Sequence, residues 1–226
     1  MRGSLLAVAG LSALAAVAVS ADEELANFPH LTVDRAARCY ARTQPAAGYG
    51  SEGRTIVYEA AAARRAALRA FATGSPAWAT SVLPDGEVRI RVMPPARDFD
   101  STGDTVLHTF AWYAQELWLR CDEIGTPDPT VVQAGPWPRG SRATHDHLAV
   151  AFHHGGRLVQ RYSTLDIAGS PDRVSATISH YSVVTHHEGF RTSGTPASLR
   201  FGLVTHDGRH LTFDAITGAI VETTAR

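Results

Sequence analysis

The stretch LRFGLVTHDGRHLTFDAITGAIVE, residues 199–222, decides the fold class expected of this chain. Asp207-Gly208 is a two-residue hairpin turn between two runs in which apolar and polar side chains alternate. Thr217-Gly218 marks a second turn into a further short run. Period-two alternation with short connections is typical of antiparallel strands. We therefore predict a β-meander at this end of the chain.

Strand patterns continue upstream to about residue 143, separated by glycine and proline turn signals such as Gly155-Gly156. A short strand also fits residues 130–133, inside a segment rich in turn formers. The strands predicted for the meander cover residues 146–153, 157–167, 174–185, 199–206, 209–214 and 219–223.

The N-terminal half predicts three helices and one hairpin. The first helix begins at Thr32 or Asp34, because Val33, Ala37 and Tyr40 then share one helical face. The second is rich in alanine, the best helix former, and the third has apolar residues on most of its surface. The second helix spans residues 55–73, the hairpin 78–92 and the third helix 104–121.

Helices followed by a meander predict an α+β fold in which N-terminal helices pack on a curved antiparallel sheet. That order is similar to the cystatin-like and NTF2-like folds, by analogy of fold class. We expect a single domain over residues 22–226. It comprises a helical and hairpin layer at 30–124, a Pro/Gly-rich connection at 125–142 and the meander at 143–226.

Residues 1–21 have the layout of a secretory signal peptide. Arg2 is followed by an apolar run of about 15 residues, shorter than the ~20 needed to span a bilayer. Val19-Ser20-Ala21 provides small residues at the cleavage site. We therefore predict a secreted or periplasmic protein with no stable membrane span after cleavage.

The chain has two cysteines, Cys39 and Cys121. Cysteines of exported proteins usually pair, so we predict a disulfide between them. Two buried thiols are the alternative. The chain has 21 basic and 22 acidic residues, a formal net charge of −1, which excludes a nucleic-acid binder that works by bulk positive charge.

Aromatic residues of the third predicted helix suggest a binding pocket. Trp112, Tyr113 and Trp118 offer more side chain than a thin seam between helix and sheet needs. A hollow between the two would accept a small apolar or aromatic molecule. The alternative is a large, filled core.

Histidine is the most unusual reactive residue, with eleven in the chain. His145, His147 and His153 fall on one face of the first meander strand, because alternate side chains point the same way. A His-x-His pair can hold zinc or copper when a third ligand arrives. Solvated histidines and a response to pH are the alternatives.

These observations predict an exported, soluble, non-catalytic module without a cofactor. It would bind a small apolar ligand, or another exported protein along a strand edge. Two alternatives stay open: a metal-assisted hydrolase that uses the strand histidines, and an accessory or assembly domain without a pocket.

Overall fold

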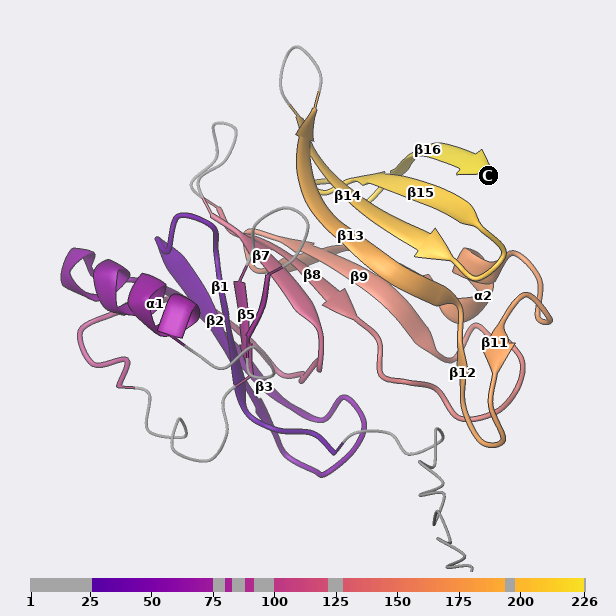
Figure 1. The fold of residues 1–226 in the computed structure, drawn as a ribbon, viewed down its shortest axis with the longest axis horizontal. Coiled ribbons are helices and arrows are strands. Elements are labelled where there is room, and N and C mark those ends of the chain that lie inside the picture. The colour runs from indigo at the N-terminus through magenta and orange to yellow at the C-terminus, as the bar shows by residue number, and fades with distance from the viewer. Residues whose placement is uncertain are drawn as a thin grey trace, which may run out of the picture.

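Three antiparallel β-sheets stack on one another in the described part of the chain, and helix α1, Ala62–Gly74, lies on the outside of the stack (Figure 1). This computed structural model describes residues 26–74, 80–82, 88–91, 100–121, 128–193 and 198–225. The predicted signal peptide lies outside these residues. Neither helix of the described part of the chain is long and apolar enough to cross a membrane.

The N-terminal half forms a six-stranded sheet in the order β4-β5-β1-β2-β3-β6. Helix α1, Ala62–Gly74, covers one face of this sheet, and Leu68 packs there against Leu31, Tyr40 and Tyr58. The strands are β1 His30–Val33, β2 Cys39–Pro45, β3 Gly53–Glu59, β4 Thr80–Val82, β5 Val88–Arg91 and β6 Thr105–Phe110.

The opposite face of the six-stranded sheet packs on a four-stranded middle sheet in the order β10-β9-β8-β7 (Figure 1). Its strands are β7 Leu117–Arg120, β8 Thr130–Ala134, β9 Leu148–His154 and β10 Arg157–Ser163. The five-residue helix α2, Thr164–Ala168, follows β10, and Ser163 caps it by accepting the backbone N–H of Asp166.

The third large sheet is the C-terminal sheet, in the order β13-β14-β15-β16, and it covers the other face of the middle sheet. A two-stranded ribbon, β11–β12, precedes it along the chain. These strands are β11 Ser175–Ala176, β12 Tyr181–Ser182, β13 Val184–Ser193, β14 Ser198–Thr205, β15 Arg209–Asp214 and β16 Ile220–Ala225.

Two apolar seams flank the middle sheet. Alternate residues of β7 pack into the two seams. Leu117 and Leu119 face the six-stranded sheet, whereas Trp118 faces the C-terminal sheet. The first seam includes Val57, Phe110, Leu117, Leu119 and Val131. The second seam is larger and more aromatic, and includes Trp118, Phe152, Phe190, Phe201 and Phe213.

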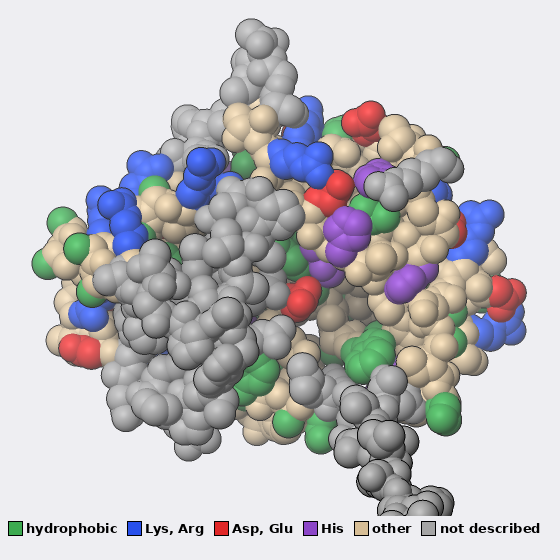
Figure 2. Space-filling view, viewed as in Figure 1, with side chains coloured by type: hydrophobic (Ala, Val, Ile, Leu, Met, Phe, Trp, Pro, Cys, Tyr) green, Lys and Arg blue, Asp and Glu red, His purple; other side chains and the backbone are tan. Residues whose placement is uncertain are grey.

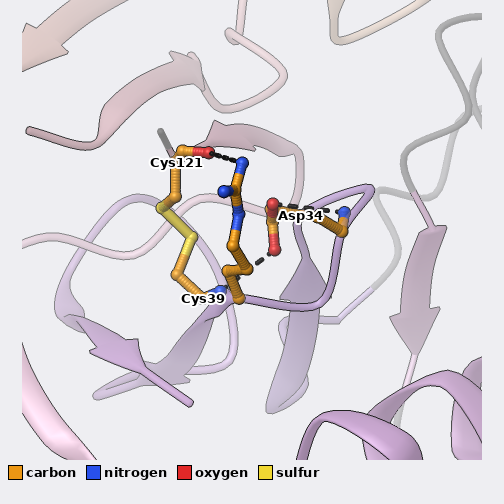
Figure 3. Close-up of a disulfide and its surroundings, with 5 residues drawn as sticks. Asp34, Cys39 and Cys121 are labelled. Carbon is orange, nitrogen blue, oxygen red and sulfur yellow. Dashed lines mark hydrogen bonds between the residues drawn. A yellow bond between two sulfur atoms is a disulfide. The ribbon is translucent and has the colours of Figure 1, made fainter. Parts of the chain in front are cut away.

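The predicted disulfide is confirmed, and it fastens the first seam. Cys39 at the start of β2 is bonded to Cys121, which follows β7, with 6.3 Å between their Cα atoms (Figure 3). Both cysteines are buried. Beside them, Asp34 accepts the backbone N–H of Cys39 at 3.0 Å, while Arg38 donates to the carbonyl oxygen of Cys121 at 3.4 Å. Burial raises the pKa of the Asp34 carboxyl despite its backbone donors.

The predicted α+β fold, with N-terminal helices packed on a sheet, is wrong, and with it the analogy to cystatin-like and NTF2-like folds. The structure is mostly β, and the described residues contain two helices. The predicted first helix is the β1–β2 hairpin, in which Asp34 accepts backbone N–H groups of the turn and Ala37 adopts a positive φ of 54°. Val33, Ala37 and Tyr40 do share one apolar cluster, but a hairpin brings them together.

The second helix prediction is confirmed only from Ala62 onward, and the third is wrong. Residues 53–59 form β3, so the helix of that region begins only at Ala62. Residues 104–121 form β6 and β7 instead of one helix. Strand β7 is buried on both faces, so its sequence lacks the alternation that marks a half-exposed strand. Most of the predicted meander does form antiparallel strands, and β15 spans the predicted residues 209–214. Residues 164–167, predicted as the end of a strand, belong instead to α2, and residues 175–182 form the short β11–β12 ribbon.

Candidate functional site

A cleft of about 680 Å³ opens at one side of the second seam. Its walls come from the residues before and within β7, the end of β8 with the following Pro136–Pro138 segment, the start of β9, the β11–β12 ribbon and the start of β13. Strands β7 and β13 are the edges of their sheets on this side. Figure 2 shows histidine side chains and acidic side chains around a hollow on this face.

The chain after β8 is pressed tightly against β9. The backbone N–H of Gly135 donates to the carbonyl oxygen of Ala149 at 2.9 Å. A Cβ atom at Gly135 would collide with the carbonyl oxygen of Leu148, so this close approach requires glycine. The backbone N–H of Tyr181 then donates to Pro138 at 3.1 Å. These contacts fix Trp137 at the cleft wall.

Two tryptophans with histidine partners form the aromatic part of the wall. Trp118 is buried, and its ring lies 4.4 Å from the ring of His187 and 5.1 Å from that of Phe201. Trp137 is half-buried, with its ring 5.2 Å from that of His180. The core therefore fixes Trp118, whereas part of Trp137 remains open to solvent.

Bulges in β13 aim consecutive histidines in different directions. The register of β13 against β14 shifts between Val184 and His186, and again between His187 and Gly189. His187 turns inward onto Trp118, where its Nδ1 lies 3.4 Å from a carboxylate oxygen of Glu116. His186 is exposed at the cleft.

A chain of hydrogen bonds lies beside the cleft near α2. Nδ1 of His147 lies 2.8 Å from the hydroxyl of Tyr181, which lies 2.9 Å from Oγ1 of Thr164. Thr164 donates to the carbonyl oxygen of Thr144 at 2.9 Å and lines the cleft. These mutual hydrogen bonds hold α2 and β12 together.

The structure separates the three aromatic residues predicted to bind a ligand. Trp118 lines the cleft, but Trp112 lies in the first seam, where its ring is 5.0 Å from that of Phe110. Tyr113 is buried, and its hydroxyl donates to the carbonyl oxygen of Phe28 at 3.0 Å. Trp112 and Tyr113 are therefore placed away from the cleft that Trp118 lines.

The three histidines predicted to hold a metal also occupy separate places. His145 and His147 precede β9, and His153 lies within it. Nδ1 of His145 is 3.1 Å from Oγ of Ser163 and 3.5 Å from a carboxylate oxygen of Asp166. Within the described ranges, no three His, Cys, Asp or Glu side chains are gathered closely enough to hold a metal ion.

Ser163, His145 and Asp166 bring together the residue types of a catalytic triad, but not its geometry. Both contacts of His145 use the same ring nitrogen, and Ser163 donates its hydroxyl hydrogen to Asp166 at 2.7 Å. In a triad the histidine uses one nitrogen for each partner. Hydrogen bonds from Ser163 lower the pKa of Asp166, which acts as part of the α2 cap.

His153 is buried in the first seam. Its ring lies 5.0 Å from that of Phe110 and 5.3 Å from that of Trp112. Neither ring nitrogen has a hydrogen-bond partner among the described residues. Burial lowers the pKa of His153 to about 4, so the imidazole is neutral at physiological pH.

Comparison of the chain with protein-family models, with curated proteins and with solved structures finds no match. The geometry of the site is therefore the basis for its interpretation. Sequence reasoning missed Glu116, Trp137 and His187, which are brought together only by the packing of separate strands. One local signal was available: Trp137 stands between two prolines, a rigid setting that presents a large ring.

Proposed function

We propose that this chain is a non-catalytic binding protein of an oxidising compartment outside the cytoplasm, and that it holds a small ring-bearing molecule in the cleft. The observation that carries this proposal is the cleft itself, about 680 Å³ in volume with Trp118 and Trp137 in its wall. That volume lies within the roughly 300–1,000 Å³ of known small-molecule sites.

The composition of the cleft wall supports a ligand with both apolar and polar groups. The half-buried Trp137 and Leu148 offer apolar surface beside the buried Trp118 and Val183, and serine, threonine and histidine side chains also line the cleft. Rings stack favourably on tryptophan at centroid separations of about 4.5–7 Å. Because the second seam fixes Trp118, the floor of the cleft is formed before any ligand arrives, and Trp137 is the tryptophan whose ring is partly open to a ligand.

The buried disulfide supports the proposed compartment. Cys39 and Cys121 are both paired, and disulfides persist where thiols are oxidised. The layout of residues 1–21 points the same way, since it is the layout of a secretory signal peptide.

Calorimetric titration of the purified protein with naphthoate and with naphthalenemethanol tests the proposal. We expect at least one of these probes to bind, and Trp137→Ala to weaken binding at least tenfold, since a partly exposed aromatic anchor is lost. Trp112→Ala is the matched control, because it removes the same ring from the first seam. No binding of either probe, or equal losses in the two variants, would contradict the proposal.

A further inference from the structure

We infer that the ligand of the cleft is an aromatic anion, a ring that carries a carboxylate or a similar acidic group. This inference rests on the proposed function and names the class of molecule. It starts from two exposed histidines at the cleft, His186 and His206. Within the described part of the chain, neither imidazole is engaged by a hydrogen bond or ion pair, so both can meet a ligand.

The backbone places these two histidines near one another. His186 pairs with Val204 across β13 and β14, two residues before His206. The backbone N–H of His206 donates to the carbonyl oxygen of Val183 at 3.2 Å, which holds it beside the start of β13. Trp118 and Trp137 stand in the same cleft. A ligand ring that contacts the half-buried Trp137 can therefore direct an acidic group toward the two imidazoles.

The charges of the cleft favour an anion once its histidines are protonated. Glu116 is the one acidic side chain among the described lining residues, and it already faces His187. With neutral histidines the lining carries the single negative charge of Glu116. With His186, His187 and His206 all protonated it carries a net charge of +2.

Acidic groups on the neighbouring elements have arginine or histidine partners of their own. Glu188 on β13 lies 2.6 Å from Arg191 and 3.4 Å from His210. Asp207, next to His206, is contacted by Arg209 at 2.8 Å and by Arg173 at 3.5 Å.

The pKa of Asp207 is consistent with these ion pairs. Burial raises that pKa, but the hydroxyl of Thr205 and the guanidinium of Arg209 outweigh burial and hold it below its usual range. The His180 ring, from the ribbon, lies 5.2 Å from that of Trp137. The exposed imidazoles of His186 and His206 are therefore the groups that can face an acidic group of a ligand.

The experiment compares naphthoate with its neutral analogue, naphthalenemethanol, at about pH 5.5 and about pH 8. Naphthoate stays ionised from about pH 5.5 to pH 8, the range in which histidine ordinarily changes its charge. We expect naphthoate to bind roughly tenfold more tightly at the lower pH, and naphthalenemethanol to bind equally at both. The neutral probe also reports any general loss of structure.

A double variant isolates the two imidazoles. His186→Asn with His206→Asn keeps hydrogen-bond donors but removes the charge, so naphthoate should bind at both pH values without the tenfold change. His210→Ala is the control, because His210 faces Glu188 and does not line the cleft. It should retain the pH dependence.

The outcomes separate this inference from the proposed function. If the neutral probe binds as tightly as naphthoate at both pH values, the cleft binds ligands but the anion inference is wrong. The anion inference is also wrong if the double variant keeps the full pH dependence. If neither probe binds at either pH, both the proposed function and the inference fail.

Discussion

The two seams of the middle sheet, one on each of its faces, differ in what closes them. The first seam is tied by the Cys39–Cys121 disulfide and encloses a neutral imidazole, His153. The second is filled by a cluster of aromatic rings and leaves a cleft at the side of β7 and β13. Both seams bury apolar side chains that stabilise the fold, but the first is also cross-linked by a disulfide, whereas the second opens into a cleft at one side.

Removing the disulfide should produce the largest effect and should act through the first seam. The two cysteines are 82 residues apart, so the bond restricts the unfolded chain strongly. We expect the double variant Cys39→Ala with Cys121→Ala to lose about 4 kcal/mol in free energy of unfolding, measured by urea denaturation. Wild-type protein with its disulfide reduced should lose a similar free energy of unfolding.

Binding measured on the same variant without denaturant tests whether the two seams act separately. If the seams act separately, affinity for the cleft probes should change less than about twofold. A large loss of affinity with little loss of stability would show that the disulfide of the first seam supports the cleft of the second.

Acid should weaken the first seam through His153. Its pKa of about 4 in the folded chain lies below the ordinary value of 6.5, so the unfolded chain takes up the proton first. The stabilisation is complete above about pH 6.5, declines as the pH falls toward 4, and amounts to about 3 kcal/mol.

The matched variants are His153→Leu and His154→Leu, which change neighbouring residues of β9. Free energies of unfolding measured between about pH 7 and pH 4 should fall less steeply for His153→Leu than for wild type. His154→Leu should retain the wild-type slope. Parallel slopes in all three proteins would show that His153 does not titrate as a buried group.

The smallest expected effect concerns α2, beside the cleft. Ser163→Ala removes the cap contact with Asp166 and should cost about 1 kcal/mol in free energy of unfolding. Ser170→Ala, just after the helix, is the control and should be nearly neutral. Thermal denaturation of both variants measures the difference, and equal midpoints would show that the cap contributes little.

The sequence identified the strands whose patterns are local. Asp207-Gly208 and the alternation around it specify β14 and β15 without reference to the rest of the chain. Strand β7 could not be recognised in this way, because it is buried on both faces and therefore reads as an apolar helix. The two cysteines were paired correctly because a chain with two cysteines leaves each of them one possible partner.

The cleft was accessible to sequence reasoning only in part. Trp118 was selected as a residue of a broad apolar helix, although it lines the cleft from a strand. Trp137 and His187 are 50 positions apart, and only sheet packing brings them to one wall. No local pattern encodes that proximity, since it depends on long-range pairing of strands.

The most direct test of ligand binding in the cleft follows the indole N–H signals of the tryptophans by NMR while naphthoate is added. We expect the signals of Trp118 and Trp137 to shift with increasing ligand and to reach saturation, because both residues line the cleft. The signal of Trp112, in the first seam, should stay in place. A shift of Trp112 with Trp118 and Trp137 unchanged would contradict the central claim.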